Sequence, residues 1–327
     1  MVGIGEASYF PAGTSLMSDF FPKEQRSRVM SIWNTGSAIG IAVGFAGGGL
    51  IVEKFGWRTA FYFAAVPGLL FATLAFAFRE PLRGSAEREG PQVKRTSEVS
   101  LRRFLELMRI PTLRATIVAQ TFLFFVLASN AFWLPTLLQR RFALTPGSSG
   151  LLAGVVLVIG GLIGTLAGGW LADRRAVKTP TAHLEVGIAG FLGGAVLIVF
   201  ALLSPMSIGP IPVFVPVFLA TVICLYLYTG PFTALSQNVV SPGLRASAVT
   251  ITLLVAHLFG DSFSTFDVGK LSDLLHGNLQ LALLITSPTL LILAAVAAAT
   301  GLPTVKRDTE QMELDWAKRK PEPVFSR

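Results

Sequence analysis

The sequence predicts an all-α membrane protein with nine transmembrane helices. Of its 327 residues, 52% are hydrophobic and only 14% are charged, a composition too apolar for an ordinary soluble domain. A helix needs about 20 apolar residues to cross a bilayer, because backbone polar groups must be paired internally in hydrocarbon. Nine stretches meet this requirement and are separated by turn or charge signals: residues 2–21, 29–52, 57–78, 113–138, 148–172, 183–204, 211–236, 246–275 and 279–302.

The distribution of basic residues predicts the orientation of these helices. When the loops are assigned alternately to two sides, the set that includes the C-terminal tail holds 22 of the 27 Lys and Arg residues. Because positively charged loops remain in the cytoplasm, we expect a multi-pass protein of the cell (inner) membrane with its N-terminus outside and its C-terminus cytoplasmic. The net charge of +8 is then explained by the basic residues of the cytoplasmic loops, and we expect no nucleic-acid partner.

The longest polar stretch, residues 79–112, predicts a cytoplasmic linker between two helical bundles. Within it, apolar residues recur at helical spacing among arginines over 101–108. This pattern favours a short amphipathic helix on the inner membrane surface, and the alternative is a solvated linker with chance periodicity. The predicted organisation is a partial N-terminal bundle of three helices (1–78), the linker, a C-terminal six-helix bundle (113–303) and a cytoplasmic tail (304–327).

Two predicted helices carry glycine at every fourth position, so that each set lines one helix face. In lipid, small residues allow the close backbone approach that holds helices together. We expect these faces to be packing surfaces, or contacts along which two halves of the protein rock: Gly36, Gly40, Gly44 and Gly48 in the second stretch, and Gly160, Gly164 and Gly168 in the fifth.

Glu6 is the clearest ionisable residue inside a predicted span. It lies 15 residues before the inner end of its helix, which is roughly 22 Å along the helix axis. An ionisable residue at such a depth costs about 2.5–3.5 kcal/mol on insertion scales, and its raised pKa would let it exchange a proton near neutral pH. The hypothesis is a proton-coupling carboxylate in the substrate cavity; a structural partner on another helix is the alternative.

His257 and Asp261 form a second candidate for coupling. They lie one helical turn apart in the eighth stretch, so both project from the same face and can hydrogen-bond or share a proton. The alternative is a histidine that only packs within an apolar helix.

Two acidic residues near predicted inner helix ends lie close to basic residues. Asp19 precedes Arg26 and Arg28, and Asp173 is followed directly by Arg174. Salt bridges of this kind can hold one face of a carrier closed, although such charges also serve as ordinary membrane anchors.

The sequence gives no support for an enzyme or a metalloprotein. It contains one cysteine and three histidines, too few for a site built from soft ligands. No cluster of nucleophile and base falls at one predicted membrane face. We therefore expect no catalytic residue, no metal and no cofactor.

Several segments resemble a known family. Gly169-Trp-Leu-Ala-Asp173-Arg174-Arg175 resembles the loop signature of major facilitator superfamily carriers, although the signature's later glycine is absent. Gly3-Ile-Gly5-Glu6-Ala7-Ser8, Gly56-Trp57-Arg58, and His257-Leu-Phe-Gly260-Asp261 resemble the spinster-like branch. The resemblance implies a major facilitator fold in which the nine helices are equivalent to helices 4–12 of twelve, the first three being absent. It also implies a role for Glu6 and His257 in proton-linked transport.

The function predicted from these observations is secondary active transport by alternating access. We expect a proton-coupled monomer that moves a small or amphipathic organic solute, lysolipid-like or sphingoid-like by the resemblance. An organic-anion or sugar-acid symporter of the same superfamily is the first alternative. The second alternative is a truncated, transport-inactive membrane protein.

Overall fold

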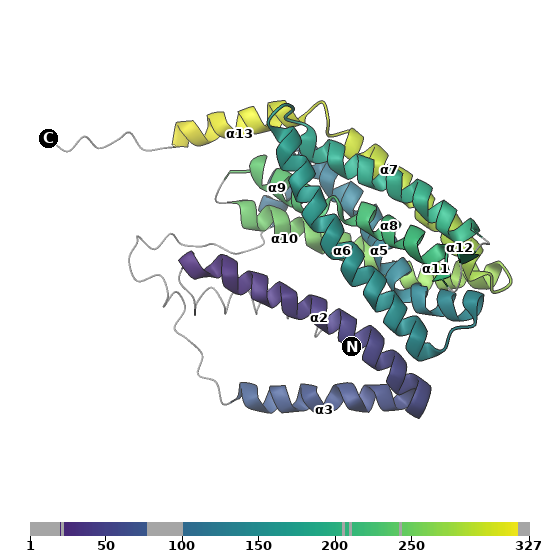
Figure 1. Ribbon diagram of the computed structural model, residues 1–327. Helices are drawn as coiled ribbons and strands as arrows, with labels where there is room; N and C mark the ends of the chain where they lie inside the picture. Colours follow the sequence, from purple (N-terminus) through teal and green to yellow (C-terminus); the bar gives the residue numbers. More distant parts are fainter. Residues whose placement is uncertain are drawn as a thin grey trace. The chain divides into compact units, whose positions relative to one another are not determined.

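The computed structural model describes residue 20 and residues 23–76, 101–204, 207–208, 211–241 and 244–319. In these ranges the chain is helical except for short connections and one pair of two-residue strands, so the predicted all-helical class is confirmed (Figure 1). The elements are α2 (Lys23–Phe55), α3 (Trp57–Ala75), α4 (Leu101–Met108), α5 (Pro111–Phe142), α6 (Pro146–Ala176), α7 (Ala182–Leu203), β1 (Ser207–Ile208), β2 (Ile211–Pro212), α8 (Phe214–Tyr226), α9 (Thr229–Asn238), α10 (Arg245–Ala256), the π-helical turn η2 (His257–Asp261), α11 (Ser262–Leu274), α12 (Leu279–Ala299) and α13 (Val305–Arg319).

Within the described residues, six helices are long and apolar enough to cross a membrane. They correspond to the six stretches predicted from residue 113 onward, with α8–α9 and α10–η2–α11 each forming one span. The predicted stretches 29–52 and 57–78 fall on α2 and α3. The first predicted stretch, 2–21, lies almost entirely outside the described residues.

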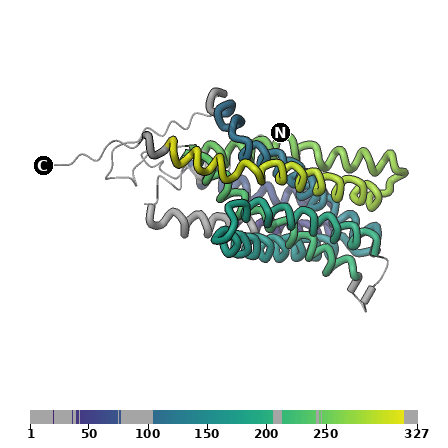
Figure 2. Tube along the Cα trace, turned by 90° about the horizontal axis from the view of Figure 1, so that it is seen from above, coloured from purple at the N-terminus to yellow at the C-terminus, as the bar shows by residue number. Residues whose placement is uncertain are grey.

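The chain divides into two units. In the described residues one unit contains α2, α3 and the beginning of α6 up to Gly154, and the other contains α4, α5, the rest of α6 and all later helices. In the second unit α5 is the central helix, since it packs against α9, α10, η2, α11 and α12, while α12 also packs along α7. Figure 2 shows these long helices running side by side, with α13 continuing beyond the end of α12.

The outer surface of the second unit is strongly apolar. Phe200 on α7 and Leu166 on α6 are 65% and 72% exposed, and Val296 on α12 is 57% exposed. Large apolar side chains exposed in such numbers would favour association in water. Lipid around this surface would remove the tendency to associate, and a lipid environment agrees with the hydropathy of the six spans.

Two predicted continuous helices are interrupted, one between α8 and α9 and the other by the π-helical turn η2 between α10 and α11. The span 214–238 breaks between α8 and α9, close to Pro231. Proline has no N–H, so the carbonyl of Leu227 loses the bond that residue 231 would otherwise donate. Gly168 of α6 lies directly against this carbonyl, where any side chain would collide with it.

Polar side chains from distant parts of the chain stabilise several helix ends. The guanidinium of Arg141, at the end of α5, donates to the carbonyls of Ala201, Leu202 and Ser204 at the C-terminal end of α7. Gln280 of α12 also donates to Leu202, at 2.6 Å. These donors satisfy carbonyls that the helix leaves unpaired at its C-terminus, where a cation is also favoured by the helix dipole.

At the other end of α5, a carboxylate from α13 accepts hydrogen bonds. Asp308 is 8% exposed, and its Oδ2 accepts from the backbone N–H of Thr112 at 3.0 Å and from its hydroxyl at 2.8 Å. An anion at this position stabilises the N-terminus of α5. The contact also attaches α13, which follows the last span, to the second unit. This unit is called the six-span unit below, since it holds five complete spans and α6 from Val155 onward.

We predict that Arg141→Gln lowers the stability of the protein far more than Arg140→Gln. Arg141 bonds three carbonyls, whereas the exposed Arg140 makes one long contact of 3.4 Å with the carbonyl of Gly277. Hydrogen bonds from a charged donor contribute about 2 kcal/mol, so the Arg141 variant should melt roughly 4–8 °C lower. Thermal unfolding of both purified variants in detergent measures this difference, and equal melting temperatures would contradict the capping role.

Candidate functional site

A single π-helical turn interrupts the span formed by α10, η2 and α11. The turn runs from His257 to Asp261, and the backbone N–H of Ser262 bonds to the carbonyl of His257 five residues earlier. The Ser262 hydroxyl donates to the same carbonyl at 2.7 Å. Turns of this type are rare, introduce an extra residue into the helix, and occur frequently at functional sites.

The side chains of His257 and Asp261 meet across this turn. His257 Nδ1 and Asp261 Oδ2 lie 2.6 Å apart, and the two side chains are 58% and 28% exposed on the surface of the six-span unit. The rings of His257 and of Phe124 on α5 pack edge to face, with their centroids 5.0 Å apart. The pair can hold one proton between a ring nitrogen and a carboxylate oxygen, because each group is within hydrogen-bond distance of the other.

Gly260 positions this turn against α5. A Cβ placed on Gly260 would lie 2.6 Å from the backbone oxygen of Thr121 and 3.0 Å from Cβ of Phe124. Only glycine allows the two backbones to approach this closely. The turn that carries the His–Asp pair is therefore held against α5, the central helix of the unit.

A second polar contact joins α5 and α12 in the interior. Asn130 Nδ2 donates to Ser287 Oγ at 2.9 Å and to the carbonyl of Val126 at 2.8 Å, while Asn130 Oδ1 is buried without a hydrogen-bond partner. Sequence reasoning did not single out Asn130. The sequence nevertheless marks this residue, because an amide side chain within the apolar stretch 113–138 requires hydrogen-bond partners inside the protein.

The structure describes only some of the other predicted site residues. Glu6 and Asp19 lie outside the described residues. Arg26 and Arg28 belong to α2, and only their backbone is described. Asp173 is exposed near the end of α6, where no ion pair within the described part of the chain involves it. The gating roles of these residues stay predictions.

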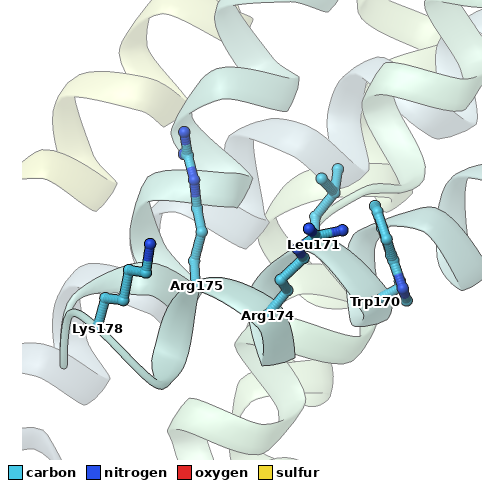
Figure 3. Close-up of a pocket in the computed structure, with 5 residues that line it drawn as sticks. All are labelled: Trp170, Leu171, Arg174, Arg175 and Lys178. Carbon is cyan, nitrogen blue, oxygen red and sulfur yellow. The ribbon is translucent and has the colours of Figure 1, made fainter.

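Arg174, the remaining predicted gating residue, lies over an aromatic ring. Its guanidinium carbon is 5.3 Å from the centre of the Trp170 ring. Arg174 and Trp170 are two of the residues around an open hollow at this end of α6 (Figure 3).

The two predicted glycine faces differ in their surroundings. Side chains added on the α6 set would meet α8 and the residue that follows it, since they would collide with Val222, Ile223 and Leu227. The α2 set has no atom within 4 Å of the added Cβ position in the part of the chain that is described. The positions compared are Gly160, Gly164 and Gly168 on α6 and Gly36, Gly40, Gly44 and Gly48 on α2.

In the first unit, other glycines make the close contacts between α2 and α6. A Cβ on Gly49 would lie 2.6 Å from the carbonyl oxygen of Pro146, and one on Gly150 would collide with the carbonyl of Phe45. Glu53 Oε2 accepts from the backbone N–H of Gly147 at 2.8 Å. A carboxylate thus lies at the N-terminus of α6, where the helix dipole favours it.

No group of three or more His, Cys, Asp or Glu side chains suited to a metal ion occurs among the described residues.

An all-helical chain with several spans, an ionisable pair within one span and glycine-mediated helix contacts has the features of a membrane carrier. The family model of the Major Facilitator Superfamily matches residues 1–265, and the chain belongs to this superfamily. The superfamily consists of transporters, not enzymes.

Within the superfamily, the predicted likeness to the spinster branch is confirmed by the relatives. Protein spinster homolog 1 of Bos taurus is 30% identical over 299 residues, which cover 84% of this chain and 54% of the relative. The Arabidopsis thaliana protein named "Probable sphingolipid transporter spinster homolog 1" is 25% identical over 343 residues, covering 96% of this chain and 68% of the relative. The chain thus spans about half the length of the animal spinster homologue.

A solved structure shares the fold. The crystal structure of a bacterial homolog to the human lysosomal transporter spinster, in an inward-facing and unoccupied conformation, superimposes with a TM-score of 0.71 at 19% identity. The match covers 99% of this chain and 78% of that one. This similarity confirms the predicted major facilitator fold.

We predict that Gly260→Ala destabilises the protein and that Gly193→Ala does not. The added methyl group at Gly260 must displace the backbone of α5 or η2, which costs about 1–3 kcal/mol. At Gly193 of α7 the nearest atom would be Cys224 Sγ at 3.5 Å, an ordinary contact. Both variants gain the same helix propensity, so thermal unfolding in detergent isolates the packing effect. An unchanged melting temperature for Gly260→Ala would show that η2 and α5 can move apart to accommodate the methyl group without a loss of stability.

Proposed function

We propose that the protein is a secondary transporter that moves a small or amphipathic organic solute by alternating access, with proton coupling. The observation that carries this proposal is the contact between His257 and Asp261 in a π-helical break within a span. An ionisable pair inside a membrane protein requires a reason to persist, because insertion of each charged group is unfavourable. Proton exchange during transport provides one.

The membership of the chain in a superfamily of transporters supports this proposal. The plant relative named as a sphingolipid transporter favours a lipid-like solute. An amphipathic cargo also agrees with the apolar, aromatic surroundings of the pair, in which Phe124 contacts His257. We propose lysolipids and sphingoid compounds as the first solutes to test.

The topology proposed for the protein follows from its charges. We propose a monomer in the cell (inner) membrane with an external N-terminus and a cytoplasmic C-terminus. In this arrangement residues 79–112 link the two bundles on the cytoplasmic side, and the helix over Leu101–Met108 lies along the membrane surface. Helix α13, which follows the last span, is then cytoplasmic.

Uptake into proteoliposomes tests the proposal. The purified protein is reconstituted with an imposed pH gradient, and uptake of a fluorescent lysophospholipid is compared with that of a radiolabelled sugar acid. Gradient-dependent lysophospholipid uptake is the expected result. Uptake of the sugar acid alone would favour the organic-anion symporter, and the absence of both from folded, monodisperse protein would favour the transport-inactive alternative.

We predict that Asp261→Asn reduces gradient-driven uptake at least tenfold while Asp267→Asn leaves it nearly unchanged. Asparagine retains the shape of the side chain but cannot accept a proton, so the pair no longer stores one. Asp267 is an exposed carboxylate two turns further along the same span, which makes it a control for a change of charge. Equal uptake by the two variants would remove the pair from the coupling mechanism.

We also predict that Glu6→Gln abolishes pH-driven uptake and leaves solute binding measurable. The carboxylate is expected to exchange the coupling proton, whereas solute contacts come from other side chains. Uptake at several imposed gradients is measured alongside equilibrium binding of the fluorescent solute. An unchanged dependence on pH would exclude Glu6 from coupling.

A further inference from the structure

The end of α6 carries an open hollow whose rim is basic. Its volume is about 410 Å³, and its lining consists of Trp170, Leu171, Arg174, Arg175 and Lys178. This volume falls in the lower part of the range of small-molecule sites, about 300–1,000 Å³. Three of the five lining residues are cations and none is acidic, so the hollow is suited to an anionic group.

The basic residues of the hollow have no anionic partner in the described structure. No ion pair within 4 Å involves Arg174, Arg175 or Lys178 in the ranges that are described. Figure 3 shows the side chains of Arg175 and Lys178 extending in the same direction from the end of the helix. Positive charges grouped in this way attract a phosphate, which accepts several charge-assisted hydrogen bonds from arginine.

The remaining lining residues suggest that the anion belongs to a lipid. Trp170 is 60% exposed and lies six residues before the end of α6, which is about 9 Å along the helix axis. Tryptophan with one face in apolar surroundings is typical of the membrane–water interface. The cation–π contact with Trp170 holds the guanidinium of Arg174 at this level, and Leu171 extends the apolar surface beside it.

We propose that this hollow binds the phosphate group of an anionic phospholipid from the adjacent leaflet. Arg174, Arg175 and Lys178 contact the phosphate, while Trp170 and Leu171 contact the glycerol region and the first carbons of the acyl chains. A free phosphate offers the same charge but makes no use of the apolar half of the site. The proposal depends on the placement of α6 in a bilayer and is independent of the transported solute.

Binding of phosphatidylglycerol to the purified protein in neutral detergent tests this site. Native mass spectrometry measures its apparent affinity, with phosphatidylcholine of the same acyl chains as the reference lipid. We expect preferential retention of phosphatidylglycerol and a loss of affinity of roughly 10- to 100-fold in the variant R174Q/R175Q/K178Q, because each basic residue contributes to the attraction of an anionic headgroup.

A charge-matched variant distinguishes the site from a general effect of net charge. R114Q/R245Q/K306Q removes three exposed cations that lie outside the hollow and outside the helix proposed to lie on the membrane surface, and we expect it to retain the affinity of the natural sequence. R174K/R175K keeps the charge but loses the planar guanidinium groups and the stacking on Trp170, so we expect an affinity between those of the natural sequence and of R174Q/R175Q/K178Q. Equal loss in the two neutralised variants, or no loss in R174Q/R175Q/K178Q, would overturn the proposal.

Inorganic phosphate separates the two possible sources of the anion. Thermal unfolding is followed in lipid-free detergent with millimolar phosphate and, separately, with phosphatidylglycerol. Stabilisation by the lipid that phosphate does not reproduce supports the lipid site. Equal stabilisation by phosphate, with no further gain from the lipid, would identify a free-anion site and contradict the proposal.

Discussion

The absence of water from the interior of a bilayer is the constraint on which this structure depends. Each polar group in a span must find a partner inside the protein, because lipid offers none. The six-span unit meets most of this requirement with contacts between helices that are distant in sequence, and Asn130 Oδ1 and Ser236 Oγ are buried exceptions among the described residues. Arg141 and Gln280 satisfy the carbonyls at the end of α7, Asp308 occupies the N-terminus of α5, and Asn130 bonds to Ser287. The same contacts that remove unpaired groups also fix which helices are neighbours.

Glycine determines how closely these helices approach. At Gly260 the π-helical turn rests on the backbone of α5, and at Gly168 helix α6 rests on the carbonyl that Pro231 leaves without its usual donor. A carbonyl exposed by a proline is thus covered by the one residue small enough to reach it. The proposed transport by alternating access would require helices to move, and a contact made by backbone contains no interlocking side chains that would have to be separated. Tight packing and relative movement of helices are therefore compatible at these positions.

Much of the fold could be predicted from the sequence, because apolar length and the position of basic residues are local properties of the chain. The six stretches predicted from residue 113 onward coincide with the six helices of the described residues that are long and apolar enough to cross a membrane. The spacing of His257 and Asp261 predicted that both side chains project from one face, and the two side chains meet. The π-helical turn between them was not predicted, since it depends on how η2 packs against α5 around Gly260. The capping carboxylate of Asp308 was missed for a similar reason: it lies in a polar tail and meets Thr112 only through the tertiary fold.

The energetics of the His–Asp pair indicate which surroundings its face requires. The side chain of Asp261 is 28% exposed and that of His257 is 58% exposed. A carboxylate that faces lipid at mid-span would cost about 2.5–3.5 kcal/mol. A neighbouring imidazole offsets this cost by charge attraction only when the imidazole is protonated and the carboxylate is ionised. A pair that gains and loses a proton also passes through states in which this compensation is absent. Under the proposed proton coupling, its face therefore borders protein or water in at least part of the cycle, and the residues that border it are the ones expected to complete the proposed path of the solute.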